Sequence, residues 1–353
     1  MAKLNQKYIA DQLSLSRTTV SRCFTNHPKI NPETRAKVFR LAAEIGYSYS
    51  AQRGGNNSKL SDRKKLAIIV GISEADRSKN DTKTAEALLT GISEKASIEE
   101  LDFEVFHVDP VDFLPRPRAR QIIKGMSCLN WKGVILIYPL KEIAVTNIMA
   151  KFPTVSVLED YDDCEVDCIH PDQTRGISRL MERLVNLGHK RIGFLSWKYP
   201  VHTPWIERRL GAYVENLYRF GLELDTNIIL NMRPEEKIPL EELAEKAAEL
   251  TRNSGVTAWV CAADHQAYHL MENFRNLGIS VPRDCSITGF DGLEPPHGLP
   301  QLTTIRIPFR DIGISAVSSL IRKIDHPNTS RRNVQVSGEF VIGKTSAPPP
   351  RPA

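Results

Sequence analysis

The sequence predicts a small all-α head of three helices followed by a larger α/β body made of two doubly wound parallel-sheet lobes. The 353 residues are 41% hydrophobic, which is enough for more than one packed core. Residues 5–45 carry three short helical patterns, and from residue 66 short apolar strands alternate with amphipathic helices. These strand-and-helix units are too many for one ordinary sheet, so we expect two lobes with a cleft at the strand carboxyl ends.

The head, residues 1–50, is predicted from helix start signals. Helices are expected over 5–13, 17–25 and 32–45. Ser16 can cap the second helix, and Asn31 followed by Pro32 can start the third. Apolar residues sufficient for one small core fall at Tyr8, Ile9, Leu13, Leu15, Val20, Phe24, Val38, Leu41, Ala42 and Ile45.

A linker over residues 51–65 follows, rich in glycine, asparagine and charge, and leads into a body over residues 66–346. The last stretch, TSAPPPRPA, is expected to be disordered, and we place the tail at residues 347–353. Within the body, strands are predicted over 66–72, 103–108, 133–138, 154–158, 191–196, 227–230, 258–263 and 286–290. Helices are predicted near 82–98, 116–129, 141–150, 172–187, 205–220, 239–253 and 265–277.

The excess positive charge lies entirely in the N-terminal part. Residues 1–65 hold 13 Lys and Arg against four Asp and Glu, whereas the rest holds 34 against 38. A local basic field beside a mildly acidic body favours a nucleic-acid partner, because clustered charge acts on association. Charge alone also allows a solvated basic surface.

The six cysteines have no metal-site spacing, and Cys164 with Cys168 is explained by chance placement. We therefore expect reduced thiols and neither metal nor cofactor. No segment has the length and composition of a signal peptide or a transmembrane helix. A cytoplasmic protein, not a membrane protein, is expected.

Residues 7–26 have the pattern of a helix-turn-helix, whose second helix needs a polar start and an apolar inner face. Ala10 is small where the two helices would cross, and Leu15 and Val20 would point inward. Arginine can read guanine edges, and Ser or Thr can contact phosphates or a thymine methyl. An ordinary helical hairpin with a polar face would give the same pattern.

The run YIADQLSLSRTTVSRCFTNHPKINPETRAKVFRLAAEIGY resembles the DNA-binding segment of the LacI/GalR repressor family. The resemblance implies sequence-specific binding to double-stranded DNA, with Arg17 and Thr18 reading bases. It places nearer the DNA backbone the residues Ser16, Thr19, Ser21, Arg22, Lys29, Asn31, Thr34 and Tyr47.

Two departures from the family stand out. Ser14 occupies the position of a turn glycine, at a cost of about 1 kcal/mol if φ is positive there. Where the family commonly has a hinge helix with a DNA-wedging leucine, this chain has Asn56, preceded by Gly54 and Gly55. Either the linker stays flexible or another residue, such as Arg53, takes the place of the leucine.

The body resembles the same family over LVNLGHKRIGFLS, ERRLGAYVENLYRFGL and VTAWVCAADHQAYHLMENFRNLGISVPRDCSITGFDG. This implies lobes of periplasmic-binding-protein type that bind a small effector. Arg208 and Asp264 match family positions, and the alternatives are an exposed helix arginine and a capping aspartate. Further ligand candidates are Trp197, Trp205 and Asp291, where ring packing is the alternative for the tryptophans.

The resulting expectation is a homodimeric transcriptional regulator, a repressor, that binds a pseudo-palindromic operator under control of a sugar or sugar derivative. The first alternative, a sugar-binding sensor without specific DNA regulation, leaves residues 1–50 unexplained. The second, an enzyme, lacks G-x-S-x-G, P-loop, H-E-x-x-H and G-x-G-x-x-G motifs, although acid-base chemistry by Asp264 or Asp291 stays open.

Overall fold

The computed structural model describes residues 5–24, 27, 29–45, 64–72, 81–110, 131–161, 163–199, 202–233 and 235–350. The chain forms two compact units. The first unit comprises Met1–His170 and Phe309–Val336, and the second comprises Pro171–Pro308 and Ser337–Ala353. The polypeptide therefore passes between the units three times, so neither unit is one continuous segment.

The three predicted head helices are confirmed. They are α1 (Gln6–Gln12), α2 (Arg17–Phe24) and α3 (Pro32–Glu44). Asn5 Oδ1 accepts hydrogen bonds from the amides of Lys7 and Tyr8, at 2.9 and 3.0 Å, and so caps α1. The helices enclose one small core, whose buried members are Ile9, Ala10, Val20, Cys23, Val38 and Ala42.

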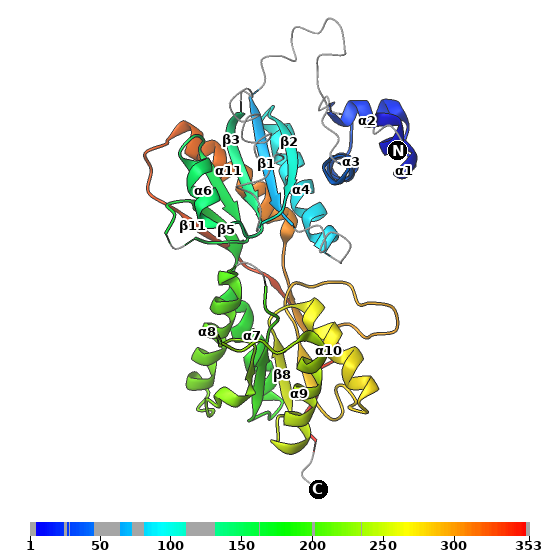
Figure 1. Cartoon of the computed structure of the whole chain (residues 1–353), viewed down its shortest axis with the longest axis vertical. Helices are drawn as coiled ribbons and strands as arrows, with labels where there is room; N and C mark the ends of the chain where they lie inside the picture. The colour runs from blue at the N-terminus through cyan, green and yellow to red at the C-terminus, as the bar shows by residue number, and fades with distance from the viewer. Residues whose placement is uncertain are drawn as a thin grey trace, which may run out of the picture. The chain divides into compact units, whose positions relative to one another are not determined.

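The first unit also holds a six-stranded sheet in the order β11-β5-β4-β3-β1-β2, flanked by helices (Figure 1). Its central pairs are parallel. The strands are β1 (Lys65–Gly71), β2 (Asp102–Val108), β3 (Trp131–Ile137), β4 (Thr154–Val157), β5 (Asp167–Pro171) and β11 (Asn333–Val336). The helices of this lobe are α4 (Asp81–Ile98), α6 (Glu142–Met149) and α11 (Phe309–Asp325).

Both faces of this sheet are covered. Ala67 and Ile69 of β1 share a buried cluster with Ala144 and Val145 of α6. Neighbouring residues on a strand point to opposite faces, and Ile68, between them, is also fully buried. The near-continuous apolar run of β1 is therefore what a parallel strand buried on both faces requires.

On this lobe, α4 and α11 approach each other through two glycines. A Cβ atom added at Gly91 would lie 1.9 Å from the carbonyl oxygen of Arg310, and one at Gly313 would lie 2.3 Å from that of Leu88. The obstacles are backbone atoms, which cannot rotate away as a flexible side chain can. The helix pair can therefore pack at this distance only without side chains at these two positions.

We expect Gly91→Val to lower the free energy of unfolding by about 1–3 kcal/mol, because overpacking forces the two helices apart. Urea denaturation of the purified variant measures this. Gly211→Ala is the control, since a Cβ at Gly211 on the second unit meets nothing within 4 Å. Equal stability of the wild type and Gly91→Val would contradict the close approach.

The second unit is built on a four-stranded parallel sheet in the order β7-β6-β8-β9. The strands are β6 (Ile192–Leu195), β7 (Ile229–Leu230), β8 (Ala258–Cys261) and β9 (Ser286–Thr288). The helices are α7 (Gln173–Asn186), α8 (Pro204–Arg219), α9 (Leu240–Asn253) and α10 (Asp264–Asn276), with a 3-10 turn at Thr226–Ile228. A separate antiparallel pair joins β10 (Thr304–Arg306) to β12 (Glu339–Val341).

The predicted strands and helices of the body are confirmed wherever the structure describes them, with one exception: in the strand predicted over 227–230, Asn227 and Ile228 belong to a 3-10 turn and only Ile229 and Leu230 form a strand. The helix predicted near 116–129 and most of the linker lie outside the described residues. Six elements were not predicted: β5, β10, α11, β11, β12 and the 3-10 turn at Thr226–Ile228. The strands among them are short, and β11 and β12 lack buried residues, so they offer little apolar periodicity.

The expectation that the C-terminal stretch TSAPPPRPA is disordered is wrong for its first residues. Thr345 is fully buried, and its hydroxyl donates to the carbonyl oxygen of Ile287 at 2.6 Å. The Ala347 amide donates to Ser286 Oγ, and the Ala347 carbonyl lies 2.8 Å from His189 Nε2. Burial lowers the pKa of His189. Hydrogen bonds to the second unit thus hold the chain in place at least to Ala347, despite its proline-rich composition.

Among the helices of the described segments, none combines the length and hydropathy needed to cross a membrane.

Candidate functional site

The turn before α2 has the backbone geometry expected for a helix-turn-helix. Ser14 has a φ of 52°, which is the left-handed conformation that glycine adopts most easily. The next amide, of Leu15, donates to the carbonyl oxygen of Ala10 at 2.9 Å. The prediction that Ser14 stands at a turn-glycine position is consistent with this conformation, at a cost of about 1 kcal/mol relative to glycine.

Ser16 caps α2, as predicted. Its Oγ accepts a hydrogen bond from the Thr19 amide at 3.0 Å and lies 2.8 Å from Thr19 Oγ1. Arg17 and Thr18, the next two residues, are exposed, and Val20 is fully buried beneath them. The capped end of α2 therefore presents Arg17 and Thr18 to solvent on a fixed backbone, as base-reading residues require.

The other predicted DNA-contacting residues lie on the same head. Arg22 is exposed and Ser21 half-buried on α2, while Lys29 is exposed before α3. Asn31 Oδ1 accepts from the Glu33 amide at 2.7 Å and so caps α3, as predicted. The remaining two are Thr34, which is half-buried on α3, and Tyr47, which lies outside the described residues.

In the second unit, a buried arginine that the sequence reasoning missed forms a polar centre. Arg209 on α8 is 3% exposed and donates to Gln173 Oε1 at 2.6 Å, to the Ala262 carbonyl oxygen, and to Asp291 Oδ1 at 3.4 Å. Its guanidinium also lies over the Phe290 ring, 3.8 Å from the centroid. Burial lowers the pKa of Arg209, and the nearby Asp291 and Asp264 offset part of that effect.

Arg208, the arginine singled out from the sequence, is half-buried on the same helix. Ile206, Arg209, Tyr213 and Asn216 are buried at helical spacing, so Arg209 lies on the inner stripe of α8. This 3.6-residue periodicity was the available signal for Arg209. Arg209 therefore stabilises the interior of the second unit through its hydrogen bonds. A ligand-binding role for Arg208 stays a proposal.

Asp264, the first residue of α10, is fully buried. Its Oδ1 accepts from Thr304 Oγ1 at 2.6 Å, and its Oδ2 accepts from the Leu293 amide at 2.7 Å. Burial raises its pKa from 3.8 to about 6, although these hydrogen bonds and Arg209 pull the pKa downward. These two hydrogen bonds connect α10 to the loop after β9 and to β10, so the Asp264 carboxyl group stabilises the fold.

The aromatic candidates form one cluster in the second unit. The Trp197 ring is 4.7 Å from the ring of His265 in an edge-on arrangement. Tyr199 Oη lies 2.9 Å from His265 Nε2, and its ring centroid is 6.0 Å from that of Trp205. The Trp205 ring in turn lies 4.5 Å from the guanidinium carbon of Arg209. The structure thus brings Tyr199 together with the two tryptophans predicted from the sequence, Trp197 and Trp205.

Gln266 adds a polar group beside these rings. It is fully buried on α10, and its Nε2 donates to Tyr199 Oη at 3.1 Å. Its Oε1 has no hydrogen-bond partner among the residues that the structure describes. Asp291, three residues after the end of β9, has a φ of 137°, and its side chain is 19% exposed. The second unit therefore carries aromatic faces and polar acceptors of the kind that bind hydroxyl-rich ligands.

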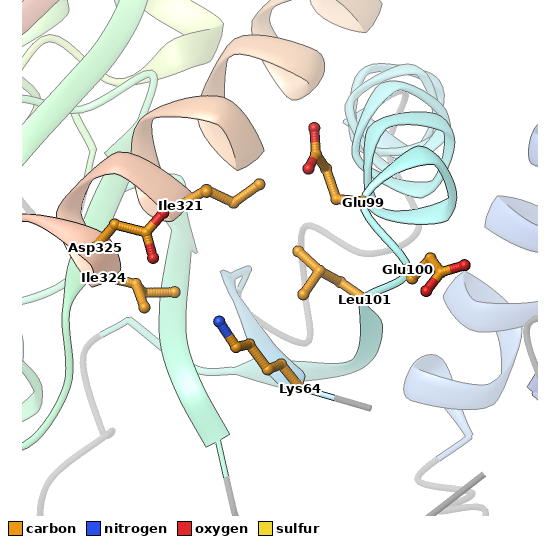
Figure 2. Close-up of a pocket in the computed structure, with 7 residues that line it drawn as sticks. All are labelled: Lys64, Glu99, Glu100, Leu101, Ile321, Ile324 and Asp325. Atoms are coloured by element: carbon orange, nitrogen blue, oxygen red, sulfur yellow. The ribbon is translucent and has the colours of Figure 1, made fainter. Parts of the chain in front are cut away.

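A separate hollow of about 390 Å³ lies on the first unit (Figure 2). Its wall combines the turn between α4 and β2 with the end of α11, and the side chains shown are Lys64, Glu99, Glu100, Leu101, Ile321, Ile324 and Asp325. None of the predicted effector residues lines it. In the described ranges, no group of three or more His, Cys, Asp or Glu is arranged to hold a metal ion.

Comparisons with known proteins agree with this architecture. Residues 181–346 match the family model of the periplasmic binding protein-like domain. The chain is 28% identical to the HTH-type transcriptional repressor CytR of Escherichia coli strain K12, over 97% of this chain and 96% of the relative.

Solved structures resemble the chain over nearly its whole length. The complex of the transcriptional regulator CelR with cellobiose aligns with a TM-score of 0.65 at 18% identity, covering 97% of this chain and 100% of the other. The lac repressor dimer bound to operator and an anti-inducer aligns with a TM-score of 0.64 at 22% identity, covering 98% and 99%. The chain therefore has the fold of these regulators, a helix-turn-helix head followed by two parallel-sheet lobes, and is similar in sequence to the CytR repressor over nearly its whole length.

Proposed function

We propose that the chain binds a pseudo-palindromic DNA operator as a homodimer and that a small hydroxyl-rich effector, a sugar or sugar derivative, controls this binding. The observation that carries the proposal is the capped start of α2, where Arg17 and Thr18 are exposed above the packed head core. Two such heads one helical turn apart, about 34 Å, would read two half-sites. Since the partner is chromosomal DNA, we place the protein in the cytoplasm, at the nucleoid when bound.

The effector half of the proposal rests on the second unit. Trp205, Tyr199 and Trp197 offer aromatic faces on which a sugar ring can stack, and Arg208 and Asp291 offer a donor and an acceptor for its hydroxyl groups. Effector binding would change operator affinity, and by linkage the operator would change effector affinity by the same factor. Repression is the proposed outcome of operator binding, as for the repressor relative.

Selection of bound duplexes from a random pool at fixed salt tests DNA reading. We expect the wild type to enrich a pseudo-palindrome and the double variant Arg17→Ala, Thr18→Ala to lose that enrichment, because each lost base contact removes about 1–3 kcal/mol of discrimination. The variant should keep salt-sensitive general binding. The control is Ser21→Ala, which removes a hydroxyl predicted to contact the DNA backbone. Enrichment of the same palindrome by the double variant would overturn the assignment.

Gel-shift titrations on the enriched duplex then test the effector, with cellobiose, glucose and ribose as the first compounds. One of them, or a related sugar, should shift the duplex affinity at least about 5-fold. The shift should be reduced in the Arg208→Met variant. Identical affinity with every sugar at saturation would contradict sugar control while leaving DNA reading intact.

A further inference from the structure

The third helix of the head packs on α4 and β2 of the first lobe, all within the first unit (Figure 1). Arg35 of α3 is 1% exposed. It donates to Ser93 Oγ of α4 at 3.3 Å and to the carbonyl oxygen of His27 in the head at 2.9 Å. One buried guanidinium thus holds a head loop and the lobe together.

Aromatic packing extends the contact. The Phe39 ring of α3 lies 4.6 Å from the Phe103 ring of β2 and 5.3 Å from the Phe24 ring of α2. Phe39 is 9% and Phe103 5% exposed. Because β2 is the edge strand of the sheet, Phe103 would lose this cover if the head moved away. The head core and the lobe are joined by a continuous line of three rings.

Ion pairs complete the contact. Glu86 of α4 lies 3.1 Å from the guanidinium of Arg40 and 3.8 Å from Nζ of Lys37, both on α3. These are two of the cations that give the head its positive field. A phosphate backbone would attract the same cations, since their charge favours association with DNA. Glu86 and DNA therefore compete for the charge on α3.

We propose that the face formed by Glu86, Ser93 and Phe103 is a docking surface for the head of the same chain, and that the docked head is held back from DNA. The inhibitory part rests on the proposed function, whereas the docking itself does not. If the head is docked for most of the time, the apparent DNA affinity is the affinity of the undocked head multiplied by the small fraction of heads that are undocked. Docking thereby sets how strongly the protein binds its operator.

The test uses Glu86→Gln in the full chain, which leaves the head sequence unchanged. Its matched control is Glu94→Gln, which removes the same charge from the same helix. In the wild type, Glu94 pairs with Arg310 of α11 instead of with the head. Amide hydrogen exchange reports docking without DNA. We expect exchange in both α3 and β2 to speed up about 3- to 10-fold in Glu86→Gln, because two ion pairs to α3 are lost, and to stay unchanged in the control.

Affinity for the duplex that the wild type selects reports inhibition. We expect Glu86→Gln to bind this duplex about 3- to 10-fold more tightly, and Glu94→Gln to bind within about twofold of the wild type. Faster exchange without tighter binding would overturn the inhibition.

The remaining outcomes separate docking from the proposed function. Equal exchange in the wild type and Glu86→Gln would overturn docking. Faster exchange in β2 but not in α3 would mean that a second copy of the chain covers this face, which also overturns it. If the wild type selects no duplex, the proposed function fails, and with it the inhibition, while the exchange comparison still decides docking.

Discussion

Arg209→Met is expected to lower the free energy of unfolding of the second unit by about 3–5 kcal/mol. Methionine can fill the space over Phe290, but it donates no hydrogen bond. The substitution therefore removes the donor that Gln173 Oε1 and the Ala262 carbonyl oxygen share inside a buried site, and it also removes the hydrogen bond to Asp291 Oδ1. Urea unfolding followed by tryptophan fluorescence measures the loss, since Trp197, Trp205 and Trp259 all lie in the second unit.

The control is Arg219→Met on the same helix. Arg219 is exposed, and its guanidinium lies 5.7 Å from the Phe220 ring, so the change should stay within about 0.5 kcal/mol. A loss of similar size in both variants would mean that the buried polar centre adds nothing beyond ordinary surface charge. Arg208→Met separates ligand binding from support, because it should alter the effector response with a smaller effect on stability.

The two adjacent arginines show where sequence reasoning stops. Family resemblance pointed to Arg208, and nothing in that alignment of motifs marked Arg209. The burial stripe of α8 marks Arg209, but a charged residue on an apolar face is usually assigned to the surface unless its partners are known. Those partners, Gln173, Ala262 and Asp291, lie on three other segments, and only the folded chain brings them together.

The head was predictable because its signals are local. The caps of Ser16 and Asn31 and the turn at Ser14 each depend on residues within three positions, and all three are present. The contact of α3 with Glu86 and Phe103 was not predictable, because it joins residues about 50 or more positions apart. Likewise, the segment around Thr345 looks like a loose tail until its hydrogen bonds to Ile287 and Thr303 are known.

The stability advantage of the wild type over Asp264→Asn is expected to shrink by about 2–3 kcal/mol between pH 4 and pH 7.5. Burial raises the pKa of Asp264 from 3.8 to about 6, so the folded chain keeps this proton where the unfolded chain has lost it. The folded state is thus favoured at low pH, and the advantage disappears as the pH rises from about 4 to about 6. Urea unfolding of both proteins across this range gives the gap directly.

Asparagine isolates the ionisation because it keeps the shape and the acceptor for Thr304 Oγ1. Its amide group would face the Leu293 amide, donor against donor, so a constant loss of about 1–3 kcal/mol is expected at every pH. Only the carboxyl group titrates, and all other groups are common to both proteins, so a changing gap must come from Asp264. A gap that stays constant from pH 4 to 7.5 would mean that Asp264 ionises at its ordinary pKa and that its hydrogen bonds fully offset the cost of burial.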